Sequence, residues 1–180
     1  MGAVFLLVKR RRYGNLLQMQ TYIFGFGTLC NPKSHARTFA ERDVTTGVIL
    51  AGYQRALNAA LATDRYVAMN LIENKDSKVE GIVAAVSEED FPALLEREVG
   101  YDLVEVSAGL SHQFPLPVYA FIMTNPNATG KVASLAYLET CLGGVPASER
   151  ERWLAETIIE HEIDDDRHAP LCRYYIPLDD

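Results

Sequence analysis

Cysteine and histidine are scarce in this 180-residue sequence, and neither forms a ligand pattern. Cys30, Cys141 and Cys172 are odd in number, far apart and without Cys-x-x-Cys spacing, so neither a disulfide framework nor a zinc site is indicated. The four histidines are scattered, and His161-Glu162 lacks the second histidine of a zinc-protease motif. We therefore expect no metal and no cofactor, and a reducing, cytoplasmic environment.

A long apolar run is also absent. Residues 3–8 are apolar but too short to span a bilayer, and the basic run 9–12 follows them, whereas a secretory signal carries its positive charges first. The net charge is −7, and because the basic run lies near the start, the remainder of the chain is more acidic still. An acidic body argues against nucleic acid as a partner. We expect neither a nucleic-acid partner nor a membrane partner.

No repeat and no Pro/Gly/Ser-rich linker divides the chain, so one domain is expected over 19–180. Met19 stands immediately before the first convincing strand. Residues 1–18 are therefore interpreted as a disordered leader or an upstream extension. The oligomeric state is left open.

Short β-like segments dominate the first two thirds of the sequence. Runs rich in Val, Ile, Tyr and Leu, separated by turn-forming residues, predict strands over 21–24, 45–50, 66–72, 79–86, 101–108 and 116–123. Helices are expected over 88–98, over 132–142 and over 149–163, the last opened by a capping box of Ser148 and Glu151. These elements predict an α+β fold. Its expected form is a small mixed β-barrel, closed or nearly closed, over about 21–124, with flanking helices, a helical pair over about 130–163 and a C-terminal tail.

A glycine-containing loop follows the first predicted strand. The strand ends at Phe24 and continues into Gly25-Phe26-Gly27-Thr28-Leu29. Glycines in such a place let backbone N–H groups turn toward a bound anion or a developing oxyanion, although a tight turn without a ligand is the alternative. A dinucleotide site is disfavoured because Cys30 stands where the third glycine is needed. Cys30 itself is interpreted as a small buried residue rather than a nucleophile.

Glu98 is the second candidate functional residue. In a helix over 88–98 it falls on the apolar face, seven positions after Phe91, whereas Glu96 and Arg97 are expected to point elsewhere. Desolvation and the helix dipole would raise the pKa of a carboxylate there toward the range that is useful for proton transfer.

Two alternatives accompany this interpretation of the helix end. Glu98 is equally compatible with a buried ion pair to an arginine such as Arg55 or Arg173. Tyr101, three residues after Glu98, is a candidate to hydrogen-bond a substrate or the carboxylate in the same cleft, although an aromatic residue that opens a strand is more often core.

The two candidate segments resemble the γ-glutamylcyclotransferase family. Residues 22–29, Tyr-Ile-Phe-Gly-Phe-Gly-Thr-Leu, are similar to its Phe/Tyr-Gly-Ser/Thr-Leu substrate loop, and residues 95–101, Leu-Glu-Arg-Glu-Val-Gly-Tyr, to its Leu-x-x-Arg-Glu-x-x-Tyr segment. The helix at 137–142 is most similar to the glutathione-acting, ChaC-like branch, whereas Gly-Thr-Leu at 27–29 is typical of the γ-glutamylamine-acting branch. Members usually carry Tyr-Gly-Ser where this chain has Phe26-Gly27-Thr28.

The resemblance implies a cofactor-independent enzyme acting on a small γ-glutamyl molecule. Glutathione, cyclised to 5-oxoproline with release of Cys-Gly, is the favoured substrate; a γ-glutamylamine substrate and a non-catalytic binding module on the same fold are the alternatives. The resemblance gives Glu98 the role of acid/base and makes Tyr101 a candidate for the binding site. The substrate-binding residues that it implies in the loop are Phe24, Gly25, Phe26, Gly27, Thr28 and Leu29.

Overall fold

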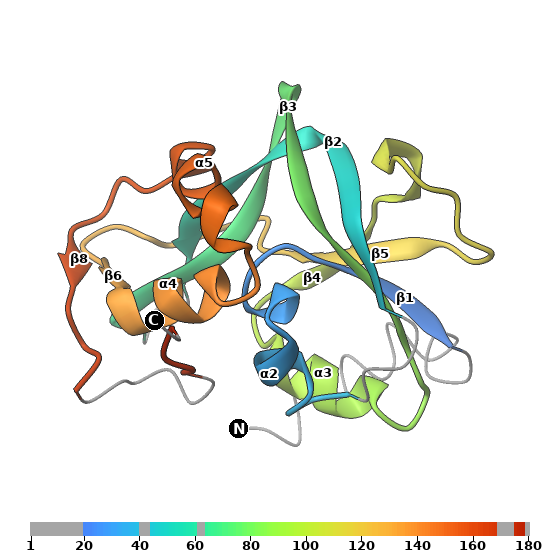
Figure 1. The fold of residues 1–180 in the computed structure, drawn as a ribbon, viewed down its shortest axis with the longest axis horizontal. Helices are drawn as coiled ribbons and strands as arrows, with labels where there is room; N and C mark the ends of the chain where they lie inside the picture. The colour runs from blue at the N-terminus through green and yellow to red at the C-terminus, as the bar shows by residue number, and fades with distance from the viewer. Residues whose placement is uncertain (1–19, 40–43, 61–63, 169–174, 179–180) are drawn as a thin grey trace.

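The computed structural model describes residues 20–39, 44–60, 64–168 and 175–178 (Figure 1). The expected leader over 1–18 lies outside these residues, as do Cys172 and Arg173.

One large mixed sheet organises the molecule. Its strands run in the order β4-β5-β1-β3-β2-β7, with β6 paired to β3 and to β8. β1 lies antiparallel to β3 and parallel to β5, which makes it a central strand. The strand bounds are β1 (Thr21–Gly25), β2 (Val44–Ala59), β3 (Tyr66–Val86), β4 (Asp102–Glu105), β5 (Val118–Ile122), β6 (Val132–Ser134), β7 (Thr157–Ile158) and β8 (Ile163–Asp164).

β2 and β3 are long, bent strands rather than the short ones expected. The predicted break between 72 and 79 is wrong, because the two predicted strands are halves of β3. The pairing with β2 shifts between Ala51↔Lys78 and Tyr53↔Glu73, so Gly52 alone lies opposite residues 74–77. Gly52 has φ +84°, in the left-handed region that favours glycine. This bulge bends both strands and forms the protruding tip of β3 in Figure 1.

The sheet is nearly closed but not strictly so. Its hydrogen-bonded path begins at β4 and ends at β7. The segment after β4 turns back to β2 through an isolated bridge between Leu50 and Leu110, and the Ser111 N–H donates to the Ile49 carbonyl at 2.8 Å. The α+β class with a barrel-like mixed sheet is therefore confirmed, and strict closure is not observed.

Four short α-helices and three 3-10 turns accompany the sheet in the described residues. The α-helices are α2 (Pro32–His35), α3 (Phe91–Arg97), α4 (Leu135–Leu142) and α5 (Arg150–Ala155). The 3-10 turns are η2 (Thr28–Cys30), η3 (Ser107–Gly109) and η4 (Ala147–Glu149). α3 begins later than the predicted residue 88, because residues 88–90 form a turn in which the Asp90 N–H donates to Ser87 Oγ at 3.1 Å. None of the helices in the described residues is long and apolar enough to cross a membrane.

The predicted helix over 149–163 is wrong beyond its first turns. α5 ends at Ala155, Thr157–Ile158 pair with β2, and Ile163–Asp164 pair with β6. The predicted capping box is also absent: the N-cap of α5 is Glu149, without a side-chain cap hydrogen bond, and Ser148 lies within η4. β-branched residues favour the extended conformation, and the edge of β2 offers backbone partners that a helix would not use.

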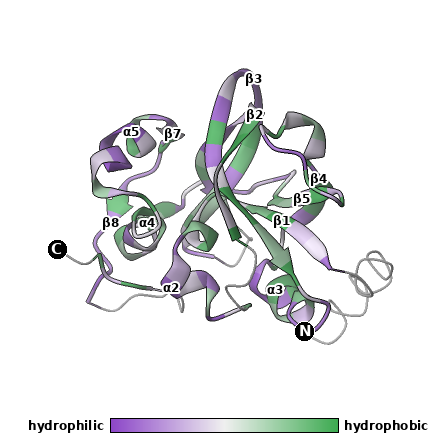
Figure 2. Ribbon diagram, turned by 45° about the vertical axis from the view of Figure 1, so that its right-hand side comes forward, coloured by the Kyte–Doolittle hydropathy of each residue, from purple (hydrophilic) through white to green (hydrophobic). Residues whose placement is uncertain are grey.

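Two apolar clusters lie on opposite sides of β1. Phe24 belongs to a large cluster that also includes Leu138 and Trp153, whereas the adjacent Ile23 belongs to a smaller one with Phe91. Successive side chains of a strand point to opposite faces, so β1 separates the two clusters. Figure 2 shows hydrophobic colour along the middle of the sheet and hydrophilic colour at the tip of β3. The glycine loop therefore begins where the two clusters meet.

Candidate active site

A small pocket forms where the loop after β1 meets α3, β3 and α4. Its volume is about 40 Å³. It is lined by Phe24, Gly25, Phe26, Gly27, Thr28, Leu29, Met69, Glu98, Tyr101, Phe121 and Tyr137. Every site residue expected from the sequence is among them, although they come from two segments, 24–29 and 98–101, that are far apart in the sequence. Their role toward a substrate stays a prediction.

Glu98 lies at the end of α3 rather than within it. It is the C-cap residue, with φ −94° and ψ 43°, and its N–H donates to the Leu94 carbonyl at 3.0 Å. Its side chain is 16 % exposed and lines the pocket. The buried orientation expected for Glu98 is therefore present, although the helix stops one residue earlier than predicted.

The side chain of Arg97 is buried, although the sequence predicts only that it points away from the apolar face of α3. Its side chain is only 3 % exposed, and its Nε lies 3.5 Å from Oε1 of Glu98. Arg55, the alternative ion-pair partner among the described residues, instead contacts Glu156 at 3.6 Å. Helix register alone places Arg97 away from the apolar face of α3, and there α2 and the loop pack over the end of α3 and enclose it.

The loop approaches the rest of the pocket closely. A Cβ atom added to Gly27 would lie 3.1 Å from the Met69 Cβ and 3.6 Å from the Tyr137 hydroxyl oxygen. The turn η2 starts immediately afterwards, with the Cys30 N–H donating to the Gly27 carbonyl at 2.9 Å. The first N–H groups of such a turn have no partner within it, so those of Thr28 and Leu29 are suited to bind an oxyanion.

Two tyrosines share the backbone of Met69 at the bottom of the pocket. The Tyr101 hydroxyl donates to the Met69 carbonyl at 2.7 Å, and the Met69 N–H donates to the Tyr137 hydroxyl at 2.9 Å. Burial raises the pKa of both phenols well above the ordinary value, and the Glu98 charge raises that of Tyr101 further. Both hydroxyls are therefore protonated at neutral pH.

Tyr137 lines the pocket, as Met69 and Phe121 do, but was not among the site residues expected from the sequence. It belongs to α4, whose first turn is capped by Ser134: the Tyr137 N–H donates to Ser134 Oγ at 3.0 Å. The two oxygens of Asp166 accept from Ser134 Oγ at 2.9 and 2.7 Å, and one of them accepts from the Ala136 N–H at 3.0 Å. Asp166 is thus buried and holds the helix that carries Tyr137.

A larger cleft lies on the other side of the loop, between the sheet and α5. Its volume is about 660 Å³, and Arg55 and Cys30 line it. Arg55 donates to Thr157 Oγ1 at 3.2 Å and to the Glu80 carbonyl at 3.1 Å, and its guanidinium lies 4.7 Å from the centre of the Trp153 ring. These contacts join β2 to α5 and β7. They give Arg55 a structural role rather than a catalytic one.

Cys30 is poorly suited to act as a nucleophile. Its thiol donates to the Gly25 carbonyl at 3.3 Å, and burial raises its pKa to about 12. A thiol with that pKa carries almost no thiolate at neutral pH. Across the described residues, no cluster of three or more His, Cys, Asp or Glu side chains is placed to hold a metal ion.

Solved structures share this fold. A structure described as a γ-glutamyl cyclotransferase matches with a TM-score of 0.63 at 12 % identity, covering 83 % of this chain and 96 % of that one. The chain has the γ-glutamylcyclotransferase fold. An uncharacterized protein from Homo sapiens matches with a TM-score of 0.60 at 15 % identity, covering 83 % and 96 %. YkqA from Bacillus subtilis matches at 0.61 and 15 % identity, covering 82 % of this chain and 57 % of its own.

The match rests on three-dimensional structure. No protein-family model and no curated protein matches the sequence. The γ-glutamylcyclotransferase-like fold expected from the two short motifs is confirmed, and in this fold both motifs line the small pocket.

Proposed function

We propose that this chain is a γ-glutamylcyclotransferase that cyclises the γ-glutamyl group of a small molecule to 5-oxoproline. The observation that carries the proposal is the convergence of Glu98, the loop backbone and two tyrosine hydroxyls on one small pocket. The likeness of the fold to a structure described as a γ-glutamyl cyclotransferase supports it.

The reaction is an internal acyl transfer. The α-amine nitrogen attacks the γ-carbonyl carbon of the same glutamyl group, the five-membered lactam closes, and the bond to the departing amine breaks. Because both reacting groups belong to one molecule, holding them in a near-attack geometry and stabilising the oxyanion provide most of the acceleration. No enzyme nucleophile is required, which agrees with the protonated Cys30.

Glu98 has the position that the remaining proton transfers need. The α-ammonium must lose a proton before the attack, and the departing nitrogen must gain one. A single carboxylate performs both steps in succession, first as base and then as acid. Its 16 % exposed side chain at the pocket wall limits competing contact with water.

The hydroxyl groups of Tyr101 and Tyr137 are suited to bind the α-ammonium and α-carboxylate of a γ-glutamyl group. The Tyr101 hydrogen is engaged by the Met69 carbonyl, so its oxygen is left to accept a hydrogen bond, as from an α-ammonium. The Tyr137 oxygen already accepts from the Met69 N–H, so its hydrogen is left to donate, as to an α-carboxylate. A volume of about 40 Å³ limits the pocket to a small group, so we expect the departing part of the substrate to lie outside it.

Glutathione is the favoured substrate, on the similarity of α4 to the glutathione-acting branch. The second candidate is a γ-glutamylamine, which the Gly27-Thr28-Leu29 sequence favours. The two differ only in the departing amine, so the comparison of turnover on both compounds decides between them.

The test measures the release of 5-oxoproline by purified wild type, Glu98→Gln and Glu96→Gln from glutathione and from a γ-glutamylamine. Glu96 is exposed on the same helix and serves as the matched control. We expect Glu98→Gln to lower kcat by about 10²–10⁴-fold while Glu96→Gln matches wild type. Equal activity of wild type and Glu98→Gln would remove Glu98 from the mechanism, and no 5-oxoproline from wild type would leave a binding module on this fold.

A further inference from the structure

Arg97 is a buried charge that joins the catalytic segments from behind the pocket. Its Nη2 donates to Thr28 Oγ1 and to Ser34 Oγ, both at 2.8 Å. Its Nη1 donates to the Ser34 carbonyl at 3.0 Å and to Thr38 Oγ1 at 2.9 Å. Its Nε lies 3.5 Å from Glu98 Oε1. One planar group therefore contacts the glycine loop, α2, the turn after α2 and the candidate base.

The buried charge of Arg97 is compensated by hydrogen bonds and by one carboxylate. Removing a charge from water costs several kcal/mol unless hydrogen bonds and an opposite charge compensate it. The Arg97 side chain, 3 % exposed, donates hydrogen bonds to four neutral oxygen atoms and lies beside one carboxylate. That carboxylate, Glu98, is the group that the proposed reaction uses.

The Thr28 hydroxyl links the pocket loop to Arg97. Its Oγ1 accepts from Arg97, while its backbone opens η2 in the pocket wall. The hydroxyl at this position therefore fixes the backbone of the loop to the end of α3. A serine keeps this bond, whereas a valine of nearly the same shape loses it.

We propose that Arg97 is a positioning residue, which holds the Thr28 backbone and the Glu98 carboxylate at a fixed separation across the pocket. This role rests on the proposed function. Arg97 does not line the pocket, so it acts through its two neighbours rather than on the substrate. Lysine cannot replace it, because a single ammonium cannot bridge the loop, α2 and Glu98 in one plane.

The test compares Arg97→Lys, Thr28→Val, Thr28→Ser and the double variant Arg97→Lys/Thr28→Val in steady-state release of 5-oxoproline. We expect Arg97→Lys and Thr28→Val each to lower kcat by about 100-fold with KM changed less than about threefold, because a displacement of about 1 Å costs that much. The double variant should be no worse than the poorer single one, and Thr28→Ser, which keeps the oxygen that accepts from Arg97, should lose less activity than Thr28→Val.

Thr157→Val controls for loss of stability alone. Thr157 is buried, accepts from Arg55 Nε and is not among the residues that line the small pocket. It should lower the unfolding temperature without changing kcat per folded molecule. The positioning role would be overturned if Arg97→Lys and Thr28→Val also lowered the unfolding temperature without changing kcat. It would likewise be overturned if their separate effects on kcat multiplied in the double variant.

A nuclear magnetic resonance measurement separates this proposal from the proposed function. We expect Arg97→Lys and Thr28→Val to shift the same amide resonances of residues 27–29 and the side-chain carboxyl carbon of Glu98, whether or not the protein turns over glutathione. If wild type makes no 5-oxoproline, the proposed function fails while these shifts still decide the role of Arg97. Unchanged resonances at Glu98 in both variants would refute it.

Discussion

Gly27 limits what the pocket tolerates at the scale of a single residue. An added methyl group would approach the Met69 Cβ at 3.1 Å and the Tyr137 oxygen at 3.6 Å. We therefore expect Gly27→Ala to raise KM for the γ-glutamyl substrate by about tenfold or more, because it displaces groups that line the site. The unfolding temperature should change by only a few degrees. Steady-state kinetics and thermal unfolding of the same preparation check this, and unchanged kinetics would contradict it.

The two pocket tyrosines make stability fall in alkali. The pKa of both Tyr101 and Tyr137 lies well above the value of 10.0 that the unfolded chain retains, so above pH 10.0 the unfolded state binds fewer protons than the folded one. The free energy of unfolding should therefore decrease as the pH rises above 10.0, and should not depend on these groups below it. Urea unfolding at several pH values checks this, and Tyr101→Phe with Tyr137→Phe should flatten the decrease. An equally steep decrease in that double variant would refute the assignment.

Sequence reasoning found the residues with distinctive chemistry and missed those defined by packing. Glu98 and the glycine loop were visible as a carboxylate on an apolar face and as a loop after a strand. The burial of Arg97 was not predicted, because helix periodicity says nothing of the α2 segment that covers it. Tyr137 was seen only as part of a motif, because nothing local reveals that α4 reaches Met69.

At the scale of elements, α4 depends on a carboxylate far along the chain. Asp166 accepts from Ser134 Oγ and from the Ala136 N–H, so Asp166→Ala leaves both donors buried without that acceptor. We expect it to lower the free energy of unfolding by about 2–3 kcal/mol. Asp165→Ala is the matched control, because this exposed neighbour pairs only with Arg167 in the contacts resolved for it and should cost much less than Asp166→Ala. Urea unfolding measures both, and equal losses would contradict the capping role.

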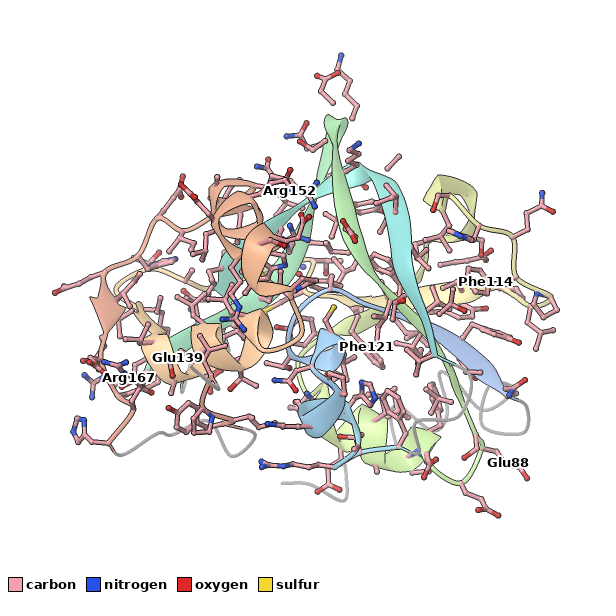
Figure 3. The ribbon with its side chains drawn as sticks, viewed as in Figure 1. Glu88, Phe114, Phe121, Glu139, Arg152 and Arg167 are labelled. Carbon is pink, nitrogen blue, oxygen red and sulfur yellow. The ribbon has the colours of Figure 1, made fainter. Side chains whose placement is uncertain are left out.

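The end of α4 and the C-terminal segment are joined by a second, more exposed set of contacts. Arg167 lies beside Glu139, with Nη1 donating to Oε1 at 3.1 Å (Figure 3). The Tyr175 hydroxyl donates to the other Glu139 oxygen at 3.0 Å. These bonds hold Arg167 and Tyr175 against α4. The helix predicted over 149–163 failed nearby, because pairing with β2 and β6 outweighs a periodic pattern there.

At the scale of the whole molecule, Arg55 links α5 and β7 to the long strands β2 and β3. It is 1 % exposed and contacts Thr157, Glu80 and the Trp153 ring. We expect Arg55→Met to lower the free energy of unfolding by about 3–5 kcal/mol, because it leaves buried acceptors and Glu156 without their partner. Arg152→Met, at an exposed position labelled in Figure 3, should cost less than about 1 kcal/mol. Chemical unfolding of both variants decides, and a similar cost for both would contradict the account.

The fold class followed from the pattern of short strands and few helices, but the path of the sheet did not. The bulge opposite Gly52 and the bridge between Leu50 and Leu110 join segments that have no local signal of their pairing. Long-range pairing of this kind places the loop, α3 and α4 around one pocket. The two sequence segments with the expected chemistry therefore meet in one pocket only through the pairing of the whole sheet.

The most direct test of the central claim is the fate of the γ-glutamyl group in water enriched in ¹⁸O. Wild-type protein is incubated with glutathione and, in parallel, with a γ-glutamylamine, and the products are identified by mass spectrometry. Internal cyclisation predicts 5-oxoproline without ¹⁸O, and its absence from the Glu98→Gln reaction. Glutamate carrying ¹⁸O would mean hydrolysis by water, and the cyclotransferase account would be wrong.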